Sequence, residues 1–126
     1  MPPKQPAPRM RLGHQATNGI SASIYGLIER GLGKRPRIAK VIRGTVEFRF
    51  KEDYAPVRVK FGVKEVLVED AQRAGKADLV IQGSLPDVVQ LTAAPMLGAL
   101  ARVAGGKVKI EGSPLLARRV LRLLEI

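Results

Sequence analysis

The chain has 126 residues, of which 45% are hydrophobic and 4% aromatic, and it contains no cysteine. This length is typical of a single domain that buries roughly two-thirds of its unfolded surface, and the missing cysteines exclude disulfides and thiolate chemistry. The net charge of +11 at pH 7 favours a polyanionic partner, either nucleic acid or an anionic membrane.

The N-terminal segment is rich in proline and has no periodic apolar pattern. It predicts a disordered basic tail over residues 1–14, followed by a single domain over residues 15–126. The segment lacks the hydrophobic stretch of a signal peptide, and no apolar run approaches the roughly 20 residues of a membrane span, so we expect a cytoplasmic protein. Residues 1–43 carry nine Lys and Arg against the single acid Glu29, which concentrates the positive charge in the N-terminal third.

An amphipathic helix is predicted over residues 17–33. Its apolar side chains Ile20, Ile24 and Leu27 follow the i, i+4, i+7 spacing of one helix face. A basic linker follows over residues 34–44, where Pro36 favours the first turn of a short second helix.

Five segments alternate between apolar and polar residues. In residues 45–50, for example, Val46 and Phe48 point to one side while Glu47 and Arg49 point to the other. Alternation of this kind, with charge on one face, predicts a largely antiparallel sheet that is wetted by solvent on that face. The five predicted strands lie within residues 45–50, 56–62, 64–70, 77–83 and 106–112.

Helices are predicted to cover the apolar face of this sheet. Ser84 is a good N-cap for a helix that begins at residue 85, Pro95 opens an apolar helix, and Ser113 caps the last helix. The last helix has a broad apolar arc that suits either a filled core or a cavity wall. Its arginines form the opposite, solvated arc. Together these elements predict an α+β domain in which helices pack on one face of a five-stranded sheet.

The order of motifs from residue 77 onward resembles the sterol carrier protein type 2 family of lipid-binding domains. The shared features are Ala77-Asp78 ahead of a strand, a Ser84-capped helix containing Asp87, and a G-K-φ-K-I-x-G strand over residues 106–112. The resemblance covers roughly residues 15–126. It implies a sheet covered by helices, with an apolar tunnel between the layers that binds a sterol, fatty acid, fatty acyl-CoA or similar lipid. It implies no cofactor, metal or covalent chemistry.

We therefore expect a non-catalytic lipid-binding and lipid-transfer protein. Family members approach anionic membranes through basic N-terminal surfaces, which here would use Lys34, Arg35, Arg37 and Lys40. The side chains expected to line the tunnel, each of which would also suit a filled core, are Phe48, Val59, Leu79, Ile81, Val88, Leu91, Met96, Leu97, Leu100, Val103, Leu116, Val120 and Leu124.

Two alternatives remain open at the level of sequence. The charge would also suit a small nucleic-acid-binding protein, although the three phenylalanines fall on the predicted buried face, where they cannot stack on bases. The protein could equally present a lipid to a partner enzyme. Catalytic motifs are missing, and the single histidine, His14, lies in the predicted tail, so no catalytic residue is assigned.

Overall fold

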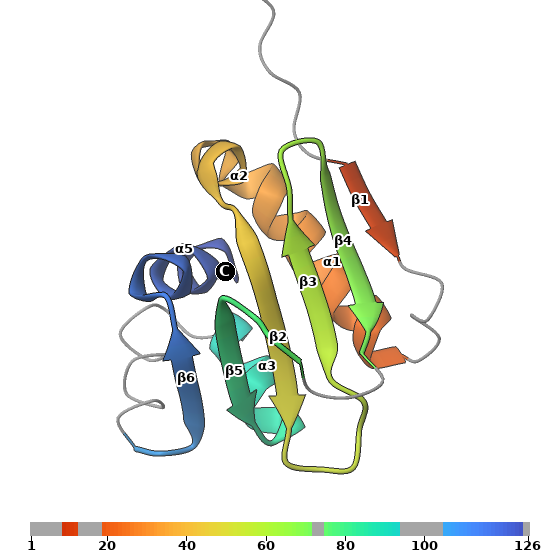
Figure 1. Ribbon diagram of the computed structural model, residues 1–126, viewed down its shortest axis with the longest axis vertical. Coiled ribbons are helices and arrows are strands. Elements are labelled where there is room, and N and C mark those ends of the chain that lie inside the picture. The colour runs from red at the N-terminus through yellow and green to blue at the C-terminus, as the bar shows by residue number, and fades with distance from the viewer. Residues whose placement is uncertain (1–8, 13–18, 72–74, 94–104, 125–126) are drawn as a thin grey trace, which may run out of the picture.

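The computed structural model describes residues 9–12, 19–71, 75–93 and 105–124. Its sheet has six strands in the order β1-β4-β3-β2-β5-β6. All the described helices lie on one face of this sheet, which confirms the predicted α+β architecture (Figure 1). The strands are β1 (Arg9–Leu12), β2 (Gly44–Phe50), β3 (Val57–Phe61), β4 (Glu65–Asp70), β5 (Leu79–Gly83) and β6 (Val108–Gly112), and the helices are α1 (Gly19–Lys34), α2 (Pro36–Val41), α3 (Leu85–Ala93) and α5 (Pro114–Leu124).

The sheet is mixed, so the prediction of five largely antiparallel strands is wrong in two respects. β2 pairs with β5 in parallel, and β4 pairs in parallel with the additional strand β1. The β3–β4 hairpin occupies one side of β2, and the chain then returns to place β5 on the other side. Alternation identifies the two faces of a strand but carries no information about its neighbours or their direction.

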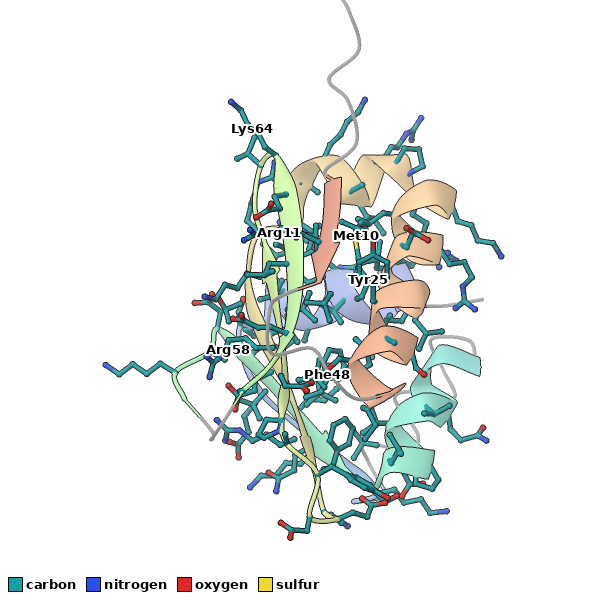
Figure 2. The ribbon with its side chains drawn as sticks, turned by 90° about the vertical axis from the view of Figure 1, so that its right-hand side faces the viewer. Met10, Arg11, Tyr25, Phe48, Arg58 and Lys64 are labelled. Carbon is teal, nitrogen blue, oxygen red and sulfur yellow. The ribbon has the colours of Figure 1, made fainter. Side chains whose placement is uncertain are left out.

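β1 also corrects the predicted disordered tail, because Arg9–Leu12 lies within residues 1–14 and is paired along its length with β4. Four residues are too few for a recognisable alternation, and the partner strand is far away in the sequence. Met10 points from β1 toward α1, where Tyr25 lies (Figure 2), and both side chains pack against the core. The remaining domain boundaries stay a prediction.

The inner face of the sheet carries the core, as its alternation predicts. Val46, Val59 and Leu79 are fully buried beneath the helices. The predicted N-caps of α3 and α5 are confirmed: the Ser84 hydroxyl accepts from the backbone N–H of Asp87 at 3.3 Å, and the Ser113 hydroxyl accepts from that of Leu116 at 3.2 Å. The helix predicted from Pro95 lies outside the described residues.

Helices α1 and α5 approach each other closely at one glycine. A Cβ atom at Gly31 would lie 2.9 Å from the Cγ atom of Leu123 and closer still to its carbonyl oxygen. In the same turn of α1, the Arg30 guanidinium donates to the carbonyl oxygen of Leu124 at 3.1 Å. These contacts fix the C-terminal end of α5 against α1.

Candidate functional site

A pocket of about 410 Å³ lies between α1, α3 and the inner face of β2. Figure 2 shows the Phe48 side chain in the space between the sheet and the helical layer. Charged side chains are missing from the described lining. The lining residues are Gly19, Ile20, Ser23, Ile24, Leu27, Phe48, Phe50, Leu85, Val88, Val89 and Leu124.

The N-terminal half of α1 forms one wall of this pocket. Ile20, Ile24 and Leu27 share the apolar face of the helix, while Gly19 and Ser23 provide small surfaces beside it. The Ser23 hydroxyl donates to the carbonyl oxygen of Gly19 at 2.8 Å, so its polar group is satisfied within the helix. This wall is therefore apolar despite the serine.

The sheet and α3 complete the pocket. Phe48 and Phe50 of β2 lie beneath it and are buried, and the ring of Phe50 meets that of Tyr54 edge to face, with centroids 6.4 Å apart. α3 begins at a fixed position because the Leu85 backbone N–H donates to both carboxylate oxygens of Glu52 at 3.0 Å. A carboxylate at this helix end also interacts favourably with the helix dipole.

Three of the side chains expected from the sequence, Phe48, Val88 and Leu124, come together in this pocket. Five others are buried in the core and do not line it, because the sheet and α5 pack directly against neighbouring elements at those positions. These five are Val59, Leu79, Ile81, Leu116 and Val120. The side chains of Leu91, Met96, Leu97, Leu100 and Val103 lie outside the described part of the chain.

The sequence interpretation missed the contribution of α1 to the pocket. It assigns Ile20, Ile24 and Leu27 to one helix face but leaves them out of the expected lining, together with Phe50 and Val89. The available signal was the spacing of Ile20, Ile24 and Leu27, because it gives α1 an apolar face that another layer or a ligand must cover.

The residues expected to face a membrane lie around the junction of α1 and α2. Lys34 ends α1, Arg35 precedes α2, and Arg37 and Lys40 lie on α2. Lys34, Arg37 and Lys40 are exposed, and Arg35 is half-buried. Because the pocket is lined by the N-terminal half of α1, these cations lie toward the opposite end of that helix.

Glu47 is a buried carboxylate on the outer face of the sheet. It accepts from Arg49 at 2.9 Å, from Arg58 at 2.9 Å and from the backbone N–H of Gly75 at 3.3 Å. Burial by itself would raise the pKa of Glu47, but the hydrogen bonds from Arg49, Arg58 and Gly75 outweigh it and hold the pKa below its ordinary value. The position was expected to be wetted by solvent, whereas two arginines cover it. Figure 2 shows Arg58 on the side of the sheet that faces away from the helices.

The described residues contain no group of three or more His, Asp or Glu side chains that could hold a metal ion. Within the same residues, the structure has no helix that is both long and apolar enough to span a bilayer. The candidate site is the pocket between α1, α3 and β2, because its lining provides an enclosed apolar surface.

Sequence comparison identifies the family of this chain. The model of the SCP-2 sterol transfer family matches residues 26–125. The chain belongs to this family. The match confirms the resemblance inferred from the motifs and includes every pocket-lining residue except Gly19, Ile20, Ser23 and Ile24. No curated protein sequence matches the chain.

Solved structures share the SCP-2 fold at low sequence identity. A structure titled UbiJ-SCP2 ubiquinone synthesis protein has a TM-score of 0.65 and 15% identity, covering 85% of this chain and 86% of its own. Sterol carrier protein 2 from Yarrowia lipolytica has a TM-score of 0.58 and 19% identity, covering 89% and 95%. Sterol carrier protein domain 2 of Helicoverpa armigera has a TM-score of 0.54 and 20% identity, covering 86% and 91%. At these identities the likeness establishes the fold.

Proposed function

We propose that the protein is a non-catalytic lipid-binding and lipid-transfer protein that holds an apolar ligand in the pocket between α1 and α3. The observation that carries the proposal is the apolar lining of a pocket of about 410 Å³. Ligand pockets in proteins range over roughly 300–1,000 Å³, and each methylene buried in one stabilises the complex by about 0.8 kcal/mol. Sterols, fatty acids and fatty acyl-CoA have apolar parts of this kind.

The lining also indicates how such a ligand would be oriented. The described lining residues include no Lys, Arg, Asp or Glu, so a carboxylate or phosphate inside the pocket would lose its hydration without gaining a charged partner. We infer that the hydrocarbon part of the ligand enters and that the polar end stays at the surface. Val89, which lines the pocket and is exposed, marks a point where the pocket meets solvent.

The proposal is tested by filling the pocket from its α1 wall. Ser23→Trp adds a large apolar side chain at an exposed lining position, and Ala22→Trp adds the same side chain at the neighbouring exposed position, which does not line the pocket. Excluding two ligand methylenes would cost about 1.6 kcal/mol, which corresponds to slightly more than a tenfold loss of affinity.

The measurement is a titration with a fluorescent fatty acid, paired with native mass spectrometry of protein purified without added lipid. We expect Ser23→Trp to weaken binding at least tenfold and Ala22→Trp to leave it unchanged. If the unaltered protein carries no lipid and binds no fatty acid or sterol probe, the proposal is wrong. Equal loss in both variants would also contradict it, because the effect would then not arise from the pocket.

We further propose that the basic N-terminal third docks on anionic membranes. The exposure of Lys34, Arg37 and Lys40 supports this proposal. Binding to phosphatidylserine-containing vesicles should fall as salt rises, because surface charges are screened beyond about 8–10 Å at physiological ionic strength. The triple variant Lys34→Gln, Arg37→Gln, Lys40→Gln should lose most of this binding while keeping its affinity for the fatty acid probe. Equal binding to neutral phosphatidylcholine vesicles would argue against docking by charge.

A second candidate function is presentation of the lipid to a partner enzyme. Its support is the likeness to the structure titled as a ubiquinone synthesis protein. Carriage and presentation differ in whether the protein alone is sufficient to move lipid from one membrane to another. Transfer of a fluorescent lipid between two vesicle populations by the purified protein would favour carriage, whereas tight ligand binding without any acceleration of transfer would favour presentation.

A further inference from the structure

A second groove, of about 470 Å³, lies between α2 and α5. It is lined by Ile38 of α2 and by Leu115, Arg118, Arg119 and Arg122 of α5. The arginines of α5 were interpreted from the sequence as an ordinary solvated helix face. In the structure Arg118 and Arg122 are exposed, as expected, and together with Arg119 they form one side of a groove whose other side is the basic helix α2.

Within the described residues of α2 and α5, every charged side chain is a cation. Neither Pro36–Val41 nor Pro114–Leu124 contains an Asp or Glu, and α2 adds the exposed cations Arg37 and Lys40. The Arg119 guanidinium donates to the carbonyl oxygen of Val41 at 3.2 Å, which holds α5 against the C-terminal end of α2. Cations held together in this way repel one another, and an anionic surface laid across them relieves that repulsion.

Two aliphatic side chains are exposed on these helices, and one of them, Leu115, lines the groove itself. Leu115 is 57% exposed and Val41 is 48% exposed, and both belong to the two helices that form the groove. Aliphatic side chains beside Lys and Arg are typical of protein surfaces that lie in the headgroup region of a bilayer. A single-stranded nucleic acid would instead be bound by exposed aromatic rings, which α2 and α5 lack.

We propose that the α2–α5 groove docks on an anionic phospholipid bilayer. Arg118 and Arg122 contact lipid phosphate and carboxylate groups, while Leu115 and Val41 insert among the uppermost methylenes. This inference rests on the membrane docking proposed above and extends it to α5, which lies outside the basic N-terminal third. The groove and the lipid pocket share no lining residue, and the substituted side chains Leu115, Arg118 and Arg122 do not line the pocket, so substitutions in the groove should leave the pocket intact.

The test is co-sedimentation with vesicles of phosphatidylcholine that contain phosphatidylserine. The double variant Arg118→Gln, Arg122→Gln removes two charges from the groove. The control Lys51→Gln, Lys76→Gln removes two exposed charges from strand-connecting segments outside the helical layer. Two fewer cations at an anionic surface should weaken binding about thirtyfold, whereas the control should change it by no more than about threefold.

A third variant, Leu115→Gln, separates insertion from simple charge attraction. It should weaken the part of vesicle binding that persists at high salt, because apolar insertion is not screened. All variants should keep the affinity of the unaltered protein for the fluorescent fatty acid, which also shows that they are folded.

Equal binding by the groove variant and its control would overturn the proposal. If the triple variant of Lys34, Arg37 and Lys40 nevertheless lost vesicle binding, docking through the N-terminal third would be supported and only the role of α5 would be wrong. If every variant bound vesicles as strongly as the unaltered protein, both docking proposals would be wrong. The proposal of lipid binding in the pocket would not be affected, because the fatty acid titration tests it separately. Loss of binding to duplex DNA by the groove variant, with no vesicle binding by the unaltered protein, would overturn the inference in favour of a nucleic-acid surface.

Discussion

The close approach of α1 and α5 makes Gly31 a sharp test of the structure. Gly31→Ala places a Cβ atom 2.9 Å from the Cγ atom of Leu123 and closer still to its carbonyl oxygen. Carbon atoms in ordinary contact are about 3.5–4.0 Å apart. The Leu123 side chain can rotate away, but its carbonyl oxygen belongs to the helix backbone and cannot. The two helices must therefore separate to admit the methyl group.

The expected loss of stability combines two opposing terms. Overpacking of this kind typically costs about 1–3 kcal/mol, whereas replacing a helical glycine with alanine gains up to about 1 kcal/mol. We expect a net loss of about 1–2 kcal/mol for Gly31→Ala. Gly26 is the matched control, because it lies in the same helix, is exposed and has no atom within 4 Å of its added Cβ. Gly26→Ala should therefore stabilise the protein by about 0.5–1 kcal/mol.

The assay is urea unfolding followed by far-ultraviolet circular dichroism, with a thermal melt of the same variants. The free energies of unfolding of the two alanine variants should differ by about 1.5–3 kcal/mol. A difference of 1 kcal/mol corresponds to roughly 2–8 °C in Tm for domains somewhat smaller and somewhat larger than this one. Gly31→Ala should also weaken binding of the fatty acid probe, because Leu124, next to the displaced Leu123, lines the pocket. If Gly31→Ala proves as stable as Gly26→Ala, the packing of α1 against α5 is wrong.

Three further predictions address the sheet and the helix caps. Glu47→Gln should lower the free energy of unfolding at neutral pH. Because the pKa of Glu47 is lower in the folded protein than its unfolded value of about 4.3, the variant and the unaltered protein should become more alike in stability below pH 4, as measured by acid unfolding. Ser113→Ala should cost about 1 kcal/mol in urea unfolding through loss of the α5 cap, and Ser113→Asp should restore most of it. A chain that lacks residues 1–12 should unfold at lower urea yet bind the fatty acid probe unchanged, because no described lining residue belongs to β1; loss of binding would show that β1 supports the pocket.

Local chemistry accounts for the features that sequence patterns predict correctly. The alternation that includes Val46 and Val59 identifies the buried face of the sheet, because side chains on a strand point to opposite faces in turn. Ser84 and Ser113 mark helix starts because a hydroxyl satisfies an N–H only a few residues away. These inferences need only residues that are near one another in the chain.

Pairing between distant segments accounts for the features that sequence patterns miss. β1 lies in a proline-rich segment, and its hydrogen bonds go to β4, more than fifty residues later. Glu47 has the alternation of a wetted position, yet it is buried because Arg58 of β3 and the backbone of Gly75 converge on it, together with Arg49 of its own strand. Neither outcome is encoded in the spacing of nearby residues.

The pocket depends both on local sequence patterns and on packing between distant segments. Local sequence patterns are enough to show that one face of α1 and one face of β2 are apolar and must meet another layer, because exposing that surface to water is unfavourable. The places where these layers touch and where they separate depend on packing across the whole fold. α1 and α5 meet at Gly31, where a missing side chain lets their backbones approach, while α1 and α3 stand apart above Phe48. An apolar pattern is satisfied equally by a neighbouring side chain or by a bound ligand, and the distance between two helices depends on packing by residues far apart in the chain.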